Sequence, residues 1–299
     1  MPVTLPVWPW LLLALAGDIP DAGFTVAIGG DVSFARGIKI RAESEGWKIV
    51  LAPLTQALRG GDARIVNLES AFGACLDSGT TDHPHLCADP AVIPWLSRAG
   101  LTGVTVANNH ALDAGPGELE KSATTLRRNQ ILVFGANAAR TGIPQTQPLG
   151  PIAVITANLS RSAWPPGRTV AIPSAATVAK TIRAAHLRYP QRPVLVILHG
   201  GRELDPSPSG FEQAYAEAAV HAGAAAVVFH GSHVAHPIAT IDGVPVHFGL
   251  GNLLFDQRAP LASTGRILRL RFRPGVPTEV LSDDCVEGNT GSPCTTNHR

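Results

Sequence analysis

Five short apolar segments of this sequence each lead directly into side chains that can bind a metal or transfer a proton. The segments are residues 24–30, 63–67, 103–108, 194–200 and 224–231. The polar side chains at or just beyond their ends are Asp31, Asn67, Glu69, Asn108, Asn109, His110, His199, His230 and His233. Asp, Asn and His are common in turns, so a turn would explain such residues after one strand, but it does not explain their presence after all five. Because ligands of open α/β sheets bind beyond the carboxyl ends of the strands, these side chains are expected to share one site.

The residue types in this set have a common chemistry. Imidazole, carboxylate and amide oxygen form a ligand set that suits Zn, Mn or Fe better than Mg. Two such ions, held roughly 3.5–4 Å apart by a shared carboxylate, can clamp a phosphoryl group for in-line attack. A histidine outside the ligand set can protonate the leaving oxygen, and a nearby carboxylate can orient that histidine. His110 and Asp113, three positions apart in the segment NNHALD, suit these two roles.

Alternating strands and helices must position these side chains. Two further apolar segments, 131–136 and 151–158, complete a set of strands that suits a sheet buried on both faces. Helices are expected within 47–60, 90–100, 117–130, 175–190 and 210–223, and several of these stretches end in Gly, Asn or Pro. Strands alone are expected after residue 235, within 236–242, 244–249, 265–273 and 277–282. The pattern predicts one α/β domain with an antiparallel, strand-rich C-terminal part.

The composition excludes several classes of protein. The 299 residues are 45% hydrophobic and 16% charged, which indicates a globular protein with a sizeable core. Lys and Arg number 24 against 23 Asp and Glu, so the net charge is +1. Because a protein without a basic field binds the phosphate backbone poorly, we expect no nucleic-acid partner.

The N-terminus and the cysteines favour export. Residues 5–16 form an apolar run with the length of a signal-peptide core, too short for a bilayer span of roughly 20 residues. No Lys or Arg precedes this run, so a misassigned start or an N-terminal strand is the alternative. Cys75 with Cys87 and Cys285 with Cys294 form two close pairs that predict local disulfides, with four free thiols as the alternative. We therefore expect an extracytoplasmic protein, whether periplasmic, secreted or on the cell surface.

Several blocks of the sequence resemble the bacterial capsule-synthesis CapA family, which is linked to poly-γ-glutamate capsule. The blocks are Gly-Asp-Val at 30–32 with Arg36, Asn-Leu-Glu at 67–69, VTVANNHALDAGPGEL at 104–119, LHGGRE at 198–203, HGSHVAHPI at 230–238 and FGLGNLLFD at 248–256. The resemblance implies a calcineurin-like metallophosphatase fold, a four-layer α/β/β/α sandwich with its site at the strand ends. It also implies, motif by motif, that the metal ligands are Asp31, Glu69, Asn109, His199, His230 and His233. His110 would be the general acid.

The sequence departs from the usual metallophosphatase pattern at three places. Ser33 stands where the first motif usually has a histidine, and the bridging acid is Glu69 in Asn-Leu-Glu. His230 and His233 lie three positions apart, with Phe229 before them, rather than in Gly-His-x-His. Because loss of a histidine weakens one metal site, we expect one or two divalent ions, and a site without metal is the alternative.

Three functions remain open from the sequence. The first is a metal-dependent hydrolase, either a phosphoesterase or a hydrolase of an amide-linked polymer. The second is a non-catalytic capsule assembly or polymer-binding factor with a degenerate site. The third is a metal-independent acid–base enzyme, such as a peptide epimerase, that uses the same histidines and carboxylates.

The partners and the domain limits complete the expectations. An anionic polymer, a phosphoester or a peptide is the expected substrate, and membrane-associated capsule machinery is a possible partner. Candidate substrate contacts are Arg36, Asn67, Asn108 and Asn252. We expect a signal-like or unstructured segment at 1–22, a CapA-like domain at 23–282, and a tail with a local disulfide at 283–299.

Overall fold

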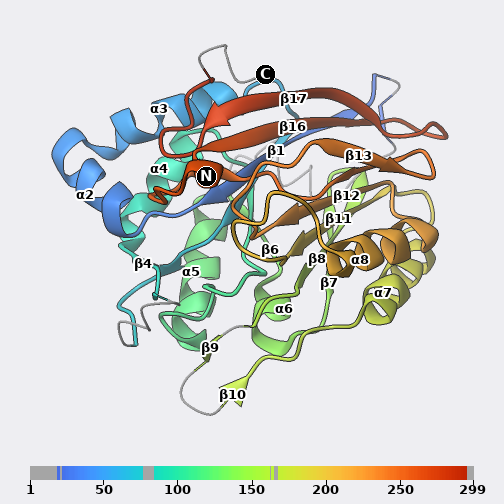
Figure 1. Cartoon of the computed structure of the whole chain (residues 1–299), viewed down its shortest axis with the longest axis horizontal. Coiled ribbons are helices and arrows are strands. Elements are labelled where there is room, and N and C mark those ends of the chain that lie inside the picture. Colours follow the sequence, from blue (N-terminus) through green and yellow to red (C-terminus); the bar gives the residue numbers. More distant parts are fainter. Residues whose placement is uncertain (1–18, 21, 77–83, 162, 165–167, 295–299) are drawn as a thin grey trace, which may run out of the picture.

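The computed structural model is built from two large β-sheets that lie face to face, with helices on both outer surfaces (Figure 1). It describes residues 19–20, 22–76, 84–161, 163–164 and 168–294. The predicted signal-like run therefore lies outside the described residues. Strands and helices alternate along most of the chain, as the sequence predicts for an α/β protein.

The first sheet contains the N-terminal strand at its centre. Its order is β17-β16-β1-β2-β5-β6, and the short β15 also pairs with β1. The strands are β1 (Phe24–Val32), β2 (Ala63–Leu68), β5 (Gly103–Thr105), β6 (Leu132–Phe134), β15 (Asn252–Leu254), β16 (Thr264–Phe272) and β17 (Glu279–Glu287). Strands β1, β2, β5 and β6 run parallel, so the polar residues that follow them gather at one edge.

The second sheet repeats this arrangement with four parallel strands, β14, β12, β11 and β8, at its centre. Its order is β13-β14-β12-β11-β8-β7. The strands are β7 (Gln145–Leu149), β8 (Ile152–Asn158), β11 (Val194–His199), β12 (Ala226–His230), β13 (Ile238–Ile241) and β14 (Val244–His247). In this sheet His199 at the end of β11 is in register with His230 at the end of β12.

Helices cover the outer face of each sheet. The first sheet carries α2 (Arg36–Glu45), α3 (Trp47–Ala57), α4 (Ile93–Arg98) and α5 (Pro116–Arg128), whose apolar faces share one core with β1, β2 and β5. The second sheet carries α7 (Ala175–Arg188) and α8 (Gly210–His221). The short α6 (Ala136–Thr141) connects β6 to β7. Helix α2 and strands β7 and β15 have no counterpart among the elements that the sequence predicts.

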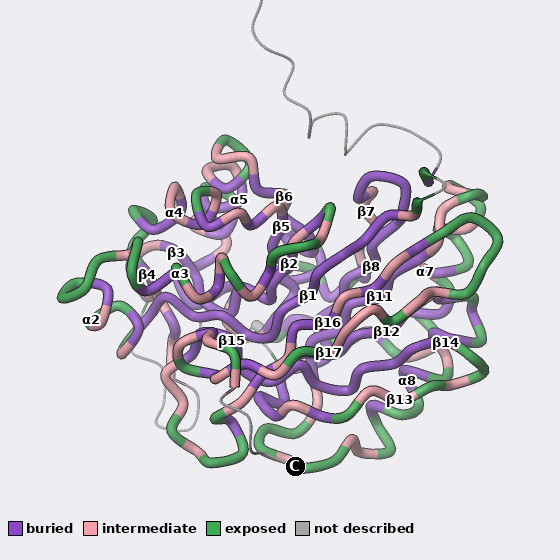
Figure 2. The backbone as a smooth tube through the Cα atoms, turned by 90° about the horizontal axis from the view of Figure 1, so that it is seen from above, coloured by how far each residue is buried: buried purple, intermediate pink, exposed green. Residues whose placement is uncertain are grey.

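A third apolar core joins the two sheets. It brings together side chains of the first sheet, such as Val26 and Ile65, and side chains of the second, such as Val154 and Leu195. The central strands are therefore buried on both faces, as their continuous apolar runs require (Figure 2). The resulting order of layers is helices, sheet, sheet, helices, which confirms the predicted four-layer α/β/β/α sandwich.

Small elements and cross-links complete the fold. The short strands are β3 (Ala71–Phe72), β4 (Cys87–Ala88), β9 (Ala163–Trp164) and β10 (Arg168–Thr169), and the 3-10 helices are η1 (Pro90–Val92) and η2 (Pro260–Ala262). Both predicted disulfides, Cys75–Cys87 and Cys285–Cys294, are present. Strand β17 continues through Cys285 because Thr264 of β16 still pairs with Glu287. Residues 283–287 therefore belong to the first sheet and lie beyond the domain limit predicted at 282.

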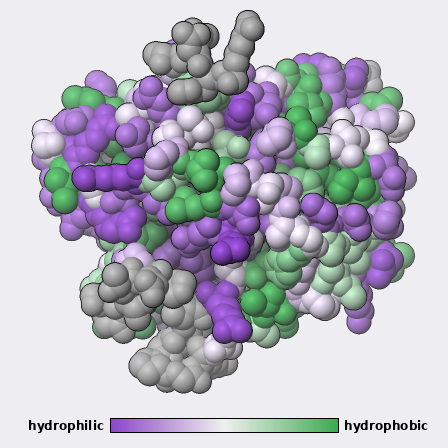
Figure 3. All heavy atoms as spheres, in the orientation of Figure 1, coloured by the Kyte–Doolittle hydropathy of each residue, from purple (hydrophilic) through white to green (hydrophobic). Residues whose placement is uncertain are grey.

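The surface mixes polar and apolar residues. On the face shown in Figure 3, hydrophobic residues are interspersed with hydrophilic ones, so no continuous apolar surface covers it. Among the residues that the structure describes, no helix has both the length and the apolar character needed to cross a membrane.

We predict that Gly30→Ala strongly destabilises the protein. A Cβ atom at position 30 would lie 2.1 Å from the carbonyl oxygen of Gly251, and neither backbone segment can move without breaking the sheet. The expected loss in the free energy of unfolding is about 3 kcal/mol. Gly117→Ala is the control, because a Cβ there meets nothing within 4 Å in helix α5 and should stabilise by up to about 1 kcal/mol. Denaturant titration measures both, and equal stability of the two variants would contradict the prediction.

Candidate metal and acid–base site

Three buried side chains bring metal-binding atoms together between the strand ends of the two sheets. Asp31 comes from β1, Glu69 follows β2, and His199 ends β11. One ligand atom from each lies within 4.8 Å of the others. These residues come from three segments far apart in the sequence, so the fold itself assembles the group.

Asp31 is the centre of the hydrogen-bond network at this site. Its Oδ1 accepts from Asn67 Nδ2 at 2.8 Å and from His230 Nδ1 at 3.1 Å. Its Oδ2 lies 3.2 Å from His233 Nδ1 and accepts from the Gly231 amide at 3.4 Å. Burial opposes ionisation, but the hydrogen bonds from the two histidines outweigh it and hold the pKa of Asp31 well below its ordinary value.

His230 has the arrangement of a metal-binding histidine. Its Nδ1 donates to Asp31, which fixes the ring, and its Nε2 is buried with no hydrogen-bond partner among the described residues. A carboxylate on one imidazole nitrogen and a metal on the other is a common combination in metalloproteins. Since an unpaired buried nitrogen is unfavourable by about 1–3 kcal/mol, a ligand at Nε2 would stabilise the site.

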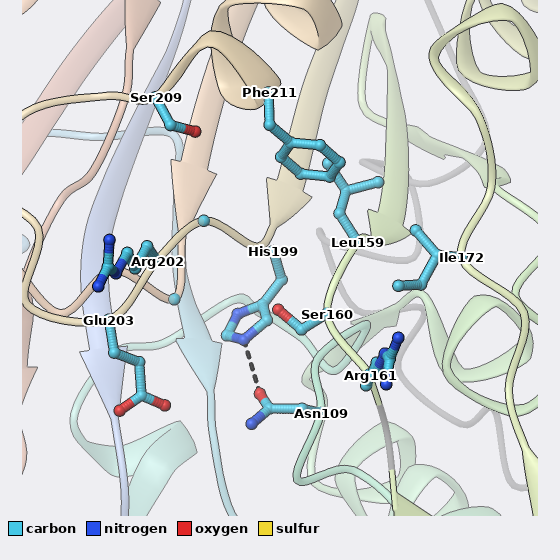
Figure 4. A pocket seen from close by; sticks show the side chains of 12 residues that line it. Asn109, Leu159, Ser160, Arg161, Ile172, His199, Arg202, Glu203, Ser209 and Phe211 are labelled. Carbon is cyan, nitrogen blue, oxygen red and sulfur yellow. Dashed lines mark hydrogen bonds between the residues drawn. The ribbon is translucent and has the colours of Figure 1, made fainter.

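His199 is held as a neutral imidazole. Burial lowers the pKa of His199 to about 3, so the ring needs no deprotonation before it binds a cation at neutral pH. Its Nε2 lies 2.8 Å from Oδ1 of Asn109 and 3.7 Å from Oε1 of Glu69 (Figure 4). His199 and Asn109, both expected ligands, are thus hydrogen-bonded to each other, and a cation bound by both would replace this bond.

His233 and Glu69 are the two candidate ligands whose pKa values are raised. His233 Nε2 lies 3.6 Å from Oε1 of Glu69, and its Nδ1 lies 2.9 Å from Oδ1 of Asn252. Burial disfavours the charged ring, but Glu69 and Asp31 outweigh this effect and raise the pKa of His233 to about 10. Burial also raises the pKa of Glu69 well above its ordinary value. The donor set and the unpaired nitrogen of His230 therefore fit a divalent ion, with protons to be displaced from His233 and Glu69.

The asparagines expected to contact substrate lie inside the network. Asn67 Nδ2 donates to Asp31 and, at 3.0 Å, to Oε2 of Glu69, while its Oδ1 accepts from Asn108 Nδ2 at 3.0 Å. Asn252 is fully buried and donates to Gln257 and to the Ala262 carbonyl. These three side chains hold the candidate ligands in place, and their contact with substrate stays a prediction.

Arg36 lies on the exposed side of the site at the start of helix α2. Its Nη2 contacts Oδ1 of Asp256 at 2.5 Å, and its backbone has a positive φ of 46°. Arg36 therefore forms a salt bridge with Asp256. Contact of Arg36 with an anionic substrate stays a prediction.

His110 and Asp113 form a separate pair beside the ligand group. His110 Nδ1 lies 2.8 Å from Oδ2 of Asp113, and the imidazole is 12% exposed. The same Oδ2 accepts from the Leu86 amide at 2.6 Å, and the Asp113 carbonyl accepts from the Leu76 amide at 3.1 Å. Leu76 and Leu86 are neighbours of Cys75 and Cys87, so the first disulfide loop fixes the carboxylate that orients His110.

A cavity of about 670 Å³ opens beside His199 and Asn109. Figure 4 shows Leu159, Ile172 and Phe211 on one wall and Arg202 with Glu203 on another, while Arg161 extends from the segment after β8. Sequence reasoning did not select Arg161, Arg202 or Glu203. The rule that selected His199 could have found them, because all three follow the ends of parallel strands of the second sheet.

Comparison with protein families gives one extended match. The family described as bacterial capsule synthesis protein PGA_cap matches residues 25–257. The PGA biosynthesis protein CapA of Bacillus subtilis (strain 168) is 23% identical over 252 residues, which cover 80% of this chain and 64% of that protein. The capsule biosynthesis protein CapA of Bacillus anthracis is 23% identical over 260 residues, which cover 78% of this chain and 60% of that protein. The chain thus spans less than two thirds of the length of these relatives.

Solved structures share the fold at low sequence identity. A hypothetical protein from Thermus thermophilus has a TM-score of 0.51 and 14% identity, covering 87% of this chain and 100% of its own. A phosphatase from Mycoplasma pneumoniae has a TM-score of 0.51 and 13% identity, and the match covers 88% of this chain and 92% of the phosphatase. The NAD nucleotidase of Haemophilus influenzae has a TM-score of 0.50 and 12% identity, and the match covers 88% of this chain and 50% of the nucleotidase. These likenesses establish the metallophosphatase-like fold.

We predict that the affinity of the site for Mn²⁺ rises with pH. The cation must displace a proton from His233, whose pKa is raised to about 10, so low pH opposes binding. Burial also raises the pKa of Glu69, which acts in the same direction. Between pH 6 and 8 the apparent association constant should rise by about tenfold per unit for each proton released. Calorimetric titration in buffers of different ionisation enthalpy counts the released protons. An affinity that does not vary with pH would contradict these protonation states.

Proposed function

The chain belongs to the bacterial capsule synthesis protein PGA_cap family, and we propose that it is a metal-dependent hydrolase of capsule or exopolymer synthesis. The observation that carries the proposal is the convergence of Asp31, Glu69 and His199 at the meeting of the strand ends. A divalent ion bound there would polarise a phosphoryl or carbonyl oxygen of the substrate. Asp31, Glu69, Asn109, His199, His230 and His233 are the proposed ligands.

His110 is the proposed general acid. Asp113 accepts from its Nδ1, which leaves Nε2 as the nitrogen that can deliver a proton to the leaving oxygen or nitrogen. Because the Leu86 amide also holds Asp113, the imidazole keeps one orientation during proton transfer. Asn67 donates to the carboxylates of Asp31 and Glu69, and Asn108 donates to Asn67, so the acid and the ligands are positioned by separate groups.

The proposed substrate is an anionic phosphoester or an amide-linked polymer of the poly-γ-glutamate type. The cavity beside His199 supports this proposal, since Arg161 and Arg202 can pair with anionic groups near the reacting bond. The names of both Bacillus relatives associate them with PGA or capsule biosynthesis. The two disulfides support an extracytoplasmic location, where such bonds persist.

A non-catalytic polymer-binding factor is the second candidate function. Asp31 already accepts from four protein groups, and Ser33 replaces the usual first-motif histidine, with its Oγ accepting from the Ala35 amide. A network satisfied by its own hydrogen bonds can persist without a cation. Elemental analysis of the purified chain tests the metal-dependent hydrolase, because less than about 0.1 ion per chain, with no gain on adding Mn²⁺ or Zn²⁺, would exclude it.

We predict that His110→Ala loses activity but keeps its metal, whereas Glu69→Gln loses both. His110→Ala should lower kcat by roughly 10²–10⁴-fold with metal content unchanged, because it removes only proton transfer. Glu69→Gln should lose metal and activity together, because it removes a ligand charge. Activity is measured on an aryl phosphate monoester, a phosphodiester and a γ-glutamyl peptide, and metal by elemental analysis. If His110→Ala lost its metal in step with its activity, the role of His110 as acid would be wrong.

We predict that the first disulfide supports His110. The double variant Cys75→Ser/Cys87→Ser frees the Leu76 and Leu86 amides that hold Asp113, so kcat should fall about 10- to 100-fold through misplacement of the imidazole. Metal content should be unchanged, and the pH profile of kcat should shift. The matched control is Cys285→Ser/Cys294→Ser, which removes a local disulfide of similar loop length away from Asp113. Equal loss of kcat in both variants would show that stability alone is responsible.

A further inference from the structure

A second cavity, of about 500 Å³, lies on the helical surface of the first sheet and contains none of the candidate site residues. It is a groove between helices α3 and α4, which lie next to each other in Figure 1. We call it the α3–α4 groove. Its lining residues are Trp47, Lys48, Leu51, Ala52, Thr55, Gln56, Arg59, Trp95, Arg98 and Ala99.

The charge of this groove is of one sign. Lys48, Arg59 and Arg98 are exposed, and none forms an ion pair with any residue that the structure describes. The lining contains no acidic side chain. The neighbouring helix α2 differs, because Lys39 and Arg41 each pair with a glutamate one turn later. Three cations that line one hollow, with no acidic side chain in its lining, give the groove a positive charge that favours an anionic ligand.

The floor of the groove is aromatic and polar. Trp47 and Trp95 are half-buried, with Trp47 edge-on to Phe34 at 5.7 Å and Trp95 beneath the Arg98 guanidinium at 4.8 Å. Both indoles are thus held in place and offer flat apolar contact area to methylene groups. Gln56 is exposed, and its side-chain amide can donate to and accept from an amide backbone.

We propose that the α3–α4 groove binds an extended acidic polyamide chain. The lining positions of α3 run from Trp47 to Arg59, roughly 18 Å at 1.5 Å per residue. That length accommodates about five residues of an extended chain. Lys48 and Arg59 lie near the two ends of the groove and can pair with carboxylates, while the indoles pack against methylenes and Gln56 meets the amides. The concave, partly polar floor suits a single chain, whereas a flat membrane surface would leave that floor uncovered.

The proposal rests on the proposed function only for the expectation that the partner is an acidic polymer. Binding in the groove needs no metal and no turnover. Phe34, which follows strand β1, contacts Trp47 and packs the aromatic floor of the groove against the segment that leaves this strand.

Binding of a fluorescein-labelled polyglutamate of about 20 residues to the full chain, followed by fluorescence anisotropy, tests the groove. The charge-reversal variant Lys48→Glu/Arg59→Glu should weaken binding by at least tenfold. The control is Lys180→Glu/Arg183→Glu on helix α7, where two exposed cations receive the same charge change, and its affinity should stay within twofold of the parent chain. All measurements are repeated with EDTA, because groove binding should not depend on metal.

Each other outcome overturns the groove proposal. Equal weakening in both variants would mean unspecific attraction to positive charge. Tighter binding of polygalacturonate than of polyglutamate would make the occupant an acidic glycan. Binding of vesicles containing 30% phosphatidylglycerol, without binding of polymer, would make this face a membrane contact. Failure of the proposed function is read separately, from the metal content and turnover of the parent chain.

Discussion

The buried carboxylate of Asp31 is the group on which the rest of the site depends. It is fully buried, so its charge must be balanced inside the protein, and His230, His233, Asn67 and the Gly231 amide supply the donors. These donors belong to both sheets, which means that the carboxylate can be satisfied only when the sheets are correctly packed. A charged group of this kind is strongly unfavourable when a partner is lost. The packing of the two sheets and the ionised state of Asp31 therefore depend on each other.

Close approach of the backbone makes this arrangement possible. Strand β15 pairs with the end of β1, and Asp31 is opposite Asn252 across that pair. The contact places Asn252 against His233, whose left-handed backbone directs its ring toward both Asp31 and Glu69. Gly30 lacks the Cβ atom that would otherwise collide with the Gly251 carbonyl and separate the two strands. A small residue directly before the buried Asp31 thus permits the contact between β1 and β15, which lie far apart in the sequence.

Much of the fold and part of the site could be predicted from the sequence because strand ends carry a local signal. Continuous apolar runs located β1, β2, β8, β11 and β12, and three of the polar side chains at strand ends, Asp31, Glu69 and His199, lie together. The sequence did not predict in the same way which groups the polar side chains contact. The sequence marks Asn67, Asn108 and Asn252 as candidate substrate contacts. The register of neighbouring strands instead turns Asn67 toward two carboxylates, Asn252 toward the His233 imidazole and Asn108 toward the Asn67 amide. Helix α2 was missed because it is short and mostly polar, with two residues buried.

Charge balance explains how one buried site can accommodate both protons and a divalent ion. Asp31 is ionised and His233 is protonated beside it, so their two charges cancel, and burial raises the pKa of Glu69, which favours the protonated form of that carboxyl. Exchange of those two protons for one divalent cation leaves two carboxylates, neutral imidazoles and a charge of +2, and the sum is again zero. Because charge buried away from water is unfavourable unless compensated, a site that conserves its net charge can load and release an ion without unfolding. Ser33 in place of a further histidine removes a ligand but no charge, so this balance is retained in the sequence as it stands.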